Sequence, residues 1–308
     1  LLSGRWHMSR EHDIWLEPGV VFHARVSPNS GAHGGPMFNP MNNTGTMTAA
    51  AAGAVELARS AGEWANPQGA LATPPELYRQ ADGVIEGVAL AWRGDPLTGL
   101  RKLAARGALG GLLAQEIRRL EAAPTTPAGW RQYFQFGEAG VFTQGDGGEI
   151  CCETHKNVSL LQKDVNVPLA SGLRLNWRWI VGELPSMLPE DQIGTHDYLS
   201  IAAEFDDGQD ITYMWSAGLP LGKAFRCPLP YWNDIETHVV ARSGRDQLGV
   251  WLDESRPLAD DYRALVGGKA TRVVRVWLIA VSLFMRRTGS CRYADIALSG
   301  PAGVEKLL

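Results

Sequence analysis

The segment GLRLNWRWI, residues 172–180, decides the fold of this chain, because apolar and polar side chains alternate along it. Its leucines and tryptophans occupy every second position, and its arginines and asparagine lie between them. Successive side chains of a β-strand point to opposite faces, so a period of two predicts a strand with one buried face. The same alternation recurs in HDYLSIAAEF, DITYMWS and ETHVVAR, at residues 196–205, 210–216 and 236–242. This part of the chain is therefore predicted to be a succession of strands.

The same pattern extends over the whole second half of the chain. Turns with Gly, Pro or Asp recur at intervals of roughly ten residues from Trp130 to Gly300, which is typical of a β-sandwich or barrel. Upstream, residues 95–122 place leucines three and four positions apart and predict a helix that ends before Pro124. We therefore predict an all-β chain with two jelly-roll-like β-sandwich domains, joined by a short helical segment.

The length of 308 residues favours two domains, because it exceeds what one hydrophobic core usually serves. The predicted first β-sandwich covers residues 8–123 and ends in the helix, and the second covers residues 130–308. Residues 1–7 read as a tag remnant before a native start at Met8, and are left out of the predicted fold. Residues Ser27–Thr46 are rich in Gly, Pro, Asn and Ser and predict a long loop.

Composition and charge exclude several classes of function. The 29 basic and 33 acidic residues give a net charge of −4 without a basic cluster, which argues against a nucleic-acid partner. No apolar run approaches the roughly 20 residues that span a bilayer, and no secretory signal is visible. Four cysteines without a disulfide framework fit a reducing compartment. A cytoplasmic protein is expected, and a homo-oligomer is left open.

Known metal and cofactor motifs are absent from the sequence. It has no HExxH, no GxxxxGK[ST], no GxGxxG between a strand and a helix, and no GxSxG. DDGQD at residues 206–210 lacks the spacing of a calcium loop, and a hairpin turn explains it better. The sequence therefore predicts no metal and no cofactor, and any activity on a small-molecule substrate would use acid and base side chains alone.

Candidate catalytic residues lie on the polar sides of the predicted strands. His238 and Glu204 are the predicted base and acid, and Tyr198 is the predicted donor to a substrate oxygen. Asp197 and His155 are reserves, since each could replace one partner of this pair. The corresponding function is a lyase or isomerase, such as a hydratase or dehydratase, acting on a largely apolar substrate. Solvated cross-strand ion pairs are the structural alternative for these charged residues.

The alternative function is a non-catalytic carbohydrate-binding β-sandwich. Aromatic rings provide flat apolar surfaces on which a sugar can stack. If the two tryptophans of residues 172–180 are buried, that platform disappears and the enzyme interpretation gains. In the enzyme interpretation, Arg178 is the predicted substrate anchor. The predicted stacking residues are Trp177, Trp179, Tyr213 and Trp215.

Several motifs of the second half resemble a known family. LNWRWIV, DITYMWS, VARSG, LGVWLDESRPLADDYR and CRYADIALSG resemble a bacterial family of β-sandwich proteins of unknown function, over roughly Tyr133 to Gly300. The family tends to have two acidic residues where this chain has His196 and Asp197. The first part, with WLEPG, AAAAGAVELA and LAWRG, is similar to galactose-binding lectin-like sandwiches. That resemblance implies a sandwich fold and, in such lectins, sugar binding through calcium, for which this chain has no matching ligand cluster.

Overall fold

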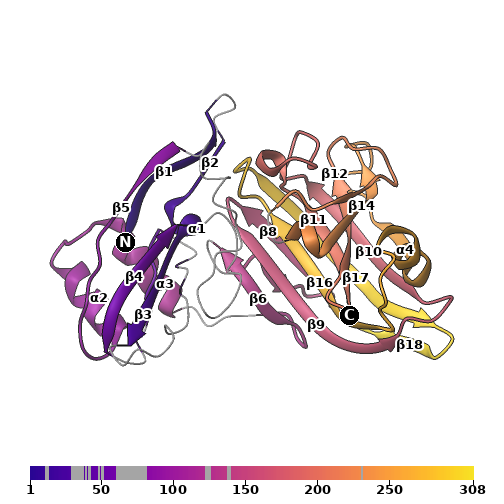
Figure 1. Cartoon of the computed structure of the whole chain (residues 1–308), viewed down its shortest axis with the longest axis horizontal. Coiled ribbons are helices and arrows are strands. Elements are labelled where there is room, and N and C mark those ends of the chain that lie inside the picture. Colours follow the sequence, from indigo (N-terminus) through magenta and orange to yellow (C-terminus); the bar gives the residue numbers. More distant parts are fainter. Residues whose placement is uncertain are drawn as a thin grey trace. The chain divides into compact units, whose positions relative to one another are not determined.

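The computed structural model describes two compact units, which are treated separately below. The first unit comprises Leu1–Pro124 with Phe136–Ala139, and the second comprises Thr125–Gln135 with Gly140–Leu308. The first unit combines strands with helices, and the second is built mainly from strands (Figure 1). The predicted mostly-β class with sandwich architecture is confirmed. The described residues are 1–10, 14–28, 38, 40, 43–47, 49, 52–59, 82–121, 126–136, 140–229 and 232–308.

The first unit contains two small sheets, with strand orders β2-β1-β5 and β3-β4. Most of residues 1–7, set aside as a predicted tag remnant, lie in β1, which is the middle strand of the larger sheet. Its side chains Leu2 and Trp6 are buried, so they belong to the core of this unit. Most of the predicted loop Ser27–Thr46 lies outside the described residues. The strands are β1 Leu2–Ser9, β2 Ile14–Leu16, β3 Phe22–Pro28, β4 Gly53–Arg59 and β5 Asp82–Gly87.

The predicted helical segment is confirmed, but it forms two helices, α2 (Pro96–Ala105) and α3 (Gly111–Glu121). A single helical turn, α1 (Pro18–Val21), lies earlier in the unit, between β2 and β3. Asp95 caps α2 by accepting a hydrogen bond from the Thr98 amide at 2.8 Å. The helices separate in the turn between them, where Gly107 and Gly110 have positive φ angles of 71° and 57°. Within the described ranges, no helix is long and apolar enough to cross a membrane.

A buried histidine makes the first unit sensitive to acid. Burial lowers the pKa of His23, on β3, from 6.5 to about 4. As the pH falls below 6.5 the unfolded chain takes up a proton that the folded unit does not, so stability is lost between these two values. Between pH 6.5 and about pH 5 we expect a loss of up to about 2 kcal/mol. Hydrogen-exchange protection factors of β3 and β4 test this, and His23→Gln should remove the difference; equal protection at both pH values in the wild type would contradict it.

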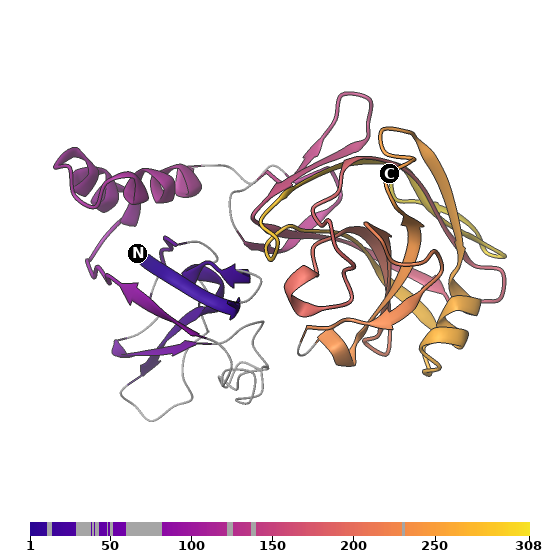
Figure 2. The same ribbon diagram turned by 90° about the horizontal axis from the view of Figure 1, so that it is seen from above.

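The second unit is a sandwich of two sheets, which form curved layers (Figures 1 and 2). The seven-stranded sheet has the order β13-β14-β12-β11-β16-β9-β6, and the six-stranded sheet has the order β15-β10-β17-β8-β7 with β18 beside β17. The strands are β6 Arg131–Phe136, β7 Phe142–Gln144, β8 Ile150–His155, β9 Val158–Pro168, β10 Arg174–Glu183, β11 Leu199–Phe205, β12 Asp210–Ser216, β13 Ala224–Arg226, β14 Glu236–Ser243, β15 Leu252–Pro257, β16 Arg272–Val281, β17 Thr288–Gly300 and β18 Gly303–Lys306. The helical turns are η2 Ile193–Thr195, η3 Trp232–Asp234 and α4 Leu258–Leu265.

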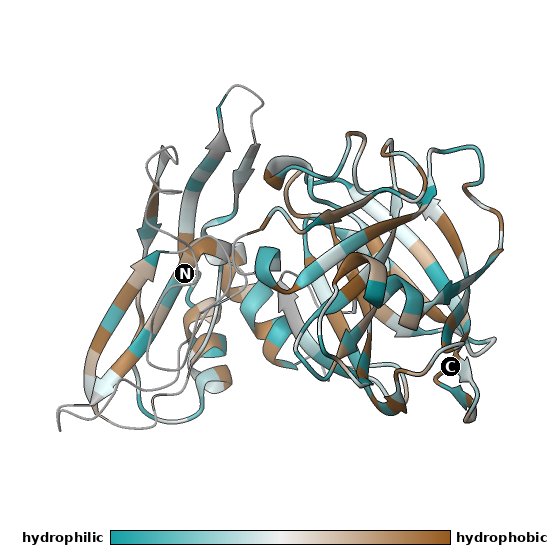
Figure 3. Cartoon of the chain, turned by 45° about the vertical axis from the view of Figure 1, so that its right-hand side comes forward, coloured by the Kyte–Doolittle hydropathy of each residue, from teal (hydrophilic) through white to brown (hydrophobic). Residues whose placement is uncertain are grey.

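The hydrophobic core lies between these two sheets. Trp179 of β10 contacts Trp215 of β12 across the sandwich, with ring centroids 5.4 Å apart. Trp177 meets Tyr213 in the same way at 5.8 Å. Figure 3 shows hydrophobic and hydrophilic residues alternating along many of these strands. The period of two in the sequence therefore sorts side chains between the core and the opposite faces of the sheets.

The opposite face of the seven-stranded sheet, called the outer face below, is also largely covered. Every residue of β11 and β12 is buried, which requires cover on both sides of the sheet. Part of the cover comes from a topological constraint: β12 and β14 pair in parallel, so the chain must cross over between them. That crossover, residues 217–235, carries β13 and η3. A second covering segment, residues 184–197, carries η2.

Candidate functional site

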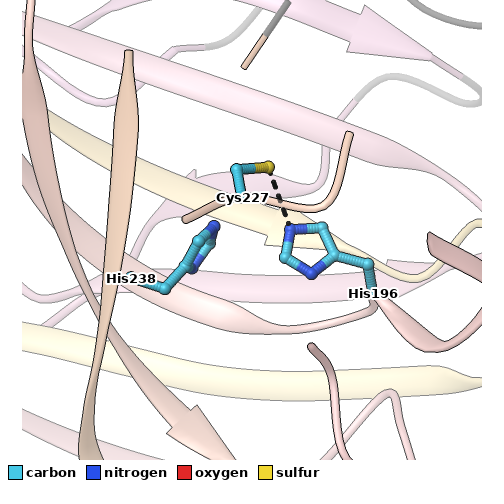
Figure 4. A group of neighbouring side chains, drawn as sticks. All are labelled: His196, Cys227 and His238. Atoms are coloured by element: carbon cyan, nitrogen blue, oxygen red, sulfur yellow. Dashed lines mark hydrogen bonds between the residues drawn. The ribbon is translucent and has the colours of Figure 1, made fainter. Parts of the chain in front are cut away.

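Three side chains from separate elements meet on the outer face of the seven-stranded sheet. His196 follows η2, Cys227 follows β13, and His238 lies on β14. All three are fully buried, and one nitrogen or sulfur atom of each lies within 4.8 Å of the other two. Figure 4 shows the three side chains turned toward one another. We call this group the His–Cys–His cluster.

The position of His196 is fixed by its two ring nitrogens. Nδ1 lies 2.5 Å from the carbonyl oxygen of Glu190, which can only accept, so Nδ1 carries the proton. Nε2 is then the lone-pair nitrogen, and it lies 3.4 Å from Cys227 Sγ (Figure 4). Burial, followed by the nearby His238, lowers the pKa of His196 to about 3. His196 is therefore a neutral imidazole at ordinary pH.

His238 has an unusual environment for a buried histidine. Its ring stacks on Phe225 at 5.1 Å and 14°, and meets the rings of His196 and Tyr198 edge-on at 4.7 and 4.9 Å. Neither of its nitrogens forms a hydrogen bond within the described part of the chain. Nε2 does lie 3.3 Å from Glu236 Oε1, but without hydrogen-bond geometry. Such a buried polar ring calls for an explanation.

The pKa values of two buried carboxyl groups near His238 are shifted in opposite directions. Burial would raise the pKa of Glu236, but its interactions with His238 outweigh this effect and lower the pKa to about 2. Burial and then the Glu236 charge raise the pKa of Asp210 well above its usual range. The hydroxyl of Thr212 lies 3.0 Å from Glu236 Oε1 and 3.2 Å from Asp210 Oδ1.

The predicted pair of His238 and Glu204 is not assembled. Glu204, on β11, is bound by both the Nε and NH2 groups of Arg275, and it accepts the indole N–H of Trp277 at 2.9 Å. In the register of the sheet, Asp210 lies between Glu204 and Glu236. The carboxylate oxygens of Glu204 are therefore already occupied by the Arg275 guanidinium and the Trp277 indole. Glu236, and not Glu204, is the carboxylate beside His238.

A second group of side chains lies where the outer face reaches β9 and β6. The ring of Trp277 meets Tyr133 at 5.1 Å and Trp232 at 6.1 Å, edge-on in both cases. Gln162 is the cross-strand neighbour of Trp277, and its Oε1 is buried without a hydrogen bond among the described residues. Tyr133 lies on β6, the edge strand of this sheet, and 45% of its surface is exposed. We call Tyr133, Gln162, Trp232 and Trp277 the aromatic edge.

Tyr198 and Asp197 are adjacent in the sequence but differ in role. Tyr198 OH donates to Glu236 Oε1 at 3.4 Å, and its ring lies beside that of His238. Asp197 accepts backbone N–H groups of Phe284 and Met285 at 2.9 and 2.6 Å. Burial nevertheless raises the pKa of Asp197 to about 7. Asp197 fixes a loop in this structure.

Two predicted site residues lie on the six-stranded sheet, away from His238. Arg178, on β10, is half-exposed and pairs with Asp253 at 3.3 Å and Asp295 at 3.2 Å. His155, on β8, is exposed, and its Nδ1 lies 3.1 Å from the Thr288 hydroxyl. The structure therefore does not bring either residue to the outer face of the other sheet.

The predicted stacking residues are core residues. Sequence alternation identified their shared face correctly, but this face packs against the opposite sheet and is almost completely buried. A ring that is enclosed in this way cannot stack on a ligand. These core residues, predicted as stacking platforms, are Trp177, Trp179, Tyr213 and Trp215.

Cys227 was not predicted as a site residue, and neither Glu236 nor His196 was among the residues chosen as acid, base or donor. These residues come together only because the crossover carries Cys227 and the segment before β11 carries His196. Neither segment contains two potential ligands at the spacing of a metal-binding motif. Cys227 and His238 are eleven positions apart, which matches none of the usual zinc motifs. The aromatic edge was missed because Tyr133 and Trp232 are far apart in sequence.

Residues 140–297, just over half of the chain, match the family described as "Protein of unknown function (DUF3047)". The chain belongs to this family. The DUF3047 match contains the whole His–Cys–His cluster and confirms the resemblance expected for the second half of the sequence. No curated protein matches the chain.

Several solved structures are similar to this DUF3047 protein at low identity. The xyloglucanase domain of NopAA, a type three effector from Sinorhizobium fredii, in complex with cellobiose, is 7% identical over 57% of this chain and 100% of its own, with a TM-score of 0.35. Endoglucanase cel12A from Rhodothermus marinus is 10% identical over 60% and 96%, with a TM-score of 0.35. A structure titled "CBM4 structure and function" is 9% identical over 56% and 96%, with a TM-score of 0.30. These values are too low to transfer a site or a substrate.

Proposed function

We propose that the second unit binds a carbohydrate or another polyol at the aromatic edge. The proposal rests on Gln162. Its Oε1 is buried and has no hydrogen bond among the described residues, and Gln162 is the cross-strand neighbour of Trp277. A buried acceptor without a donor costs free energy, on the order of 1–3 kcal/mol. A hydroxyl group of a bound ligand would supply the missing donor.

The surrounding side chains support a polyol. The exposed ring of Tyr133, which packs edge-on against the buried Trp277, offers an apolar surface next to polar groups, and this combination is found in many ligand pockets. Arg275 and Glu204, on adjacent strands, add a guanidinium and a carboxylate close to the Trp277 indole. Planar polar groups and aromatic rings together suit a molecule with an apolar face and a rim of hydroxyls.

The hydratase or dehydratase hypothesis has less support. Its predicted acid, Glu204, is bound by Arg275 and Trp277, and its predicted base, His238, is fully buried. The cytoplasmic location, the small-molecule partner and a homo-oligomer stay predictions.

Substitution at the aromatic edge tests the proposal. We expect Tyr133→Ala and Trp232→Ala each to weaken binding of soluble oligosaccharides by about tenfold or more, or about 1.4 kcal/mol. Isothermal titration calorimetry with neutral gluco-, galacto- and manno-oligosaccharides measures the change. Trp251→Ala is the matched control, because this partly exposed ring stacks on Arg178 beside the other sheet. The proposal fails if no oligosaccharide binds the wild type, or if all three variants bind equally well.

A further inference from the structure

We infer that His196, Cys227 and His238 are the ligands of a transition-metal ion, and we assign zinc(II), which binds imidazole and thiolate ligands together. Zinc prefers nitrogen and sulfur ligands in a tetrahedral arrangement, and three protein ligands leave a fourth position open. The inference does not depend on sugar binding at the aromatic edge. It concerns a different set of side chains on the same outer face.

The distances in the cluster suit one ion. Zn–N bonds of about 2.0 Å and Zn–S bonds of about 2.3 Å at a tetrahedral angle place nitrogen and sulfur about 3.5 Å apart. His196 Nε2 and Cys227 Sγ are 3.4 Å apart. The third ligand atom, on His238, lies within 4.8 Å of both. A small movement of this ring would complete the site.

His196 is already held in the form of a ligand. Its Nδ1–H donates to the Glu190 carbonyl, which orients the ring and leaves the lone pair on Nε2. The Glu190 carboxylate in turn accepts hydrogen bonds from the Ala217 amide at 2.6 Å and from the Ser216 hydroxyl. This second contact ties the segment that carries His196 to the beginning of the crossover that carries Cys227. Metal-binding histidines commonly have such an oriented second nitrogen.

His238 supplies the independent observation that points to a ligand. It is completely buried, and neither ring nitrogen has a hydrogen bond in the described ranges. Leaving such a group unsatisfied is costly, and a bond to an ion would remove that cost for one nitrogen. Glu236 lies next to the ring and provides the carboxylate that often accompanies a histidine ligand.

Charge and proton balance are also consistent with a divalent ion. Binding requires Cys227 to lose its thiol proton, and burial raises the pKa of this thiol. The ion replaces that proton, which is released to the solvent. The thiolate then supplies one negative charge to the divalent ion, and the two imidazoles bind as neutral ligands.

Zinc and cobalt titrations of the whole chain test the inference. The purified protein is treated with a chelator, dialysed and loaded with ZnCl2 or CoCl2, and bound metal is counted after gel filtration. We expect one zinc ion per chain and, with cobalt(II), a thiolate-to-cobalt charge-transfer band with the visible bands of a tetrahedral ion. Cys227→Ser should abolish the charge-transfer band, and His238→Asn should weaken zinc binding by at least tenfold.

Matched controls separate this site from other thiols and histidines. Cys151→Ser and His155→Gln remove a partly exposed cysteine and an exposed histidine elsewhere in the same unit, and should bind zinc like the wild type. If Cys227→Ser does not fold, the wild-type cobalt spectrum and His238→Asn decide the question. The inference is overturned if the wild type binds no stoichiometric metal, if the cobalt spectrum lacks a thiolate band, or if zinc binding is lost only in the control variants. Because no sugar is present, failure here leaves the aromatic edge untouched.

Discussion

Replacing Trp179 by alanine is expected to lower the free energy of unfolding of the second unit by about 3–5 kcal/mol. Its side chain is fully buried, and its ring contacts Trp177, Trp215 and Tyr293. Alanine leaves a cavity that these large rings cannot fill without moving. The indole N–H bond to Glu254, at 3.2 Å, is lost as well. Urea unfolding followed by tryptophan fluorescence measures the change.

The control for this experiment is again Trp251→Ala. Removing that ring costs its contact with Arg178, about 0.5–1 kcal/mol, and opens no cavity in the core. A loss below about 1 kcal/mol for Trp179→Ala, together with a loss of oligosaccharide binding, would return Trp179 to the role of a stacking platform.

Replacing Arg275 by methionine is expected to cost about 2–4 kcal/mol, because it leaves the carboxylate of Glu204 without its charged partner. The side chain of Glu204 is only 11% exposed, whereas that of Arg275 is 34% exposed. Solvent therefore reaches the guanidinium side of the pair and keeps the effect below that of a fully enclosed ion pair. Trp277 still donates to the carboxylate, but one neutral hydrogen bond cannot replace a guanidinium.

The double variant Glu204→Gln/Arg275→Met provides the test of this explanation. It removes both charges, so it should be more stable than Arg275→Met alone if the cost comes from an unpaired carboxylate. Urea unfolding of the single and double variants gives the coupling energy. Additive losses would mean that the methionine variant fails through packing of the aromatic edge.

The strands of the second unit were predictable because the sequence alternates. Residues 172–180 predicted both a strand and its buried face, and the structure places that face in the core. The polar faces were harder to interpret. Tyr198 and His238 were expected at a surface facing a substrate, yet covering segments bury both of them. Alternation identifies the two sides of a strand, but it cannot say whether loops lie over the polar side.

The His–Cys–His cluster could not be predicted from the sequence, because its three residues lie far apart along the chain and belong to no common motif. His238 was selected because it lies on the polar face of a predicted strand. Cys227 lies in the crossover and has no other potential metal ligand close to it in the sequence. Glu204 was paired with His238 because both lie on polar faces, but Asp210 separates them in the sheet. Strand order decides such neighbours, and strand order depends on long-range pairing that local patterns do not contain.

The parallel pairing of β12 with β14 limits how this protein can change through insertion and deletion. The segment 217–235 connects the end of β12 to the start of β14, so it must span the length of a strand. A deletion in this segment would therefore shift β14 out of its pairing with β12. Insertions meet no such limit, since extra residues can bulge outward while both strands keep their places. Natural or engineered variation in length should therefore enlarge this segment more readily than shorten it, and should alter access to Cys227 without altering the sandwich.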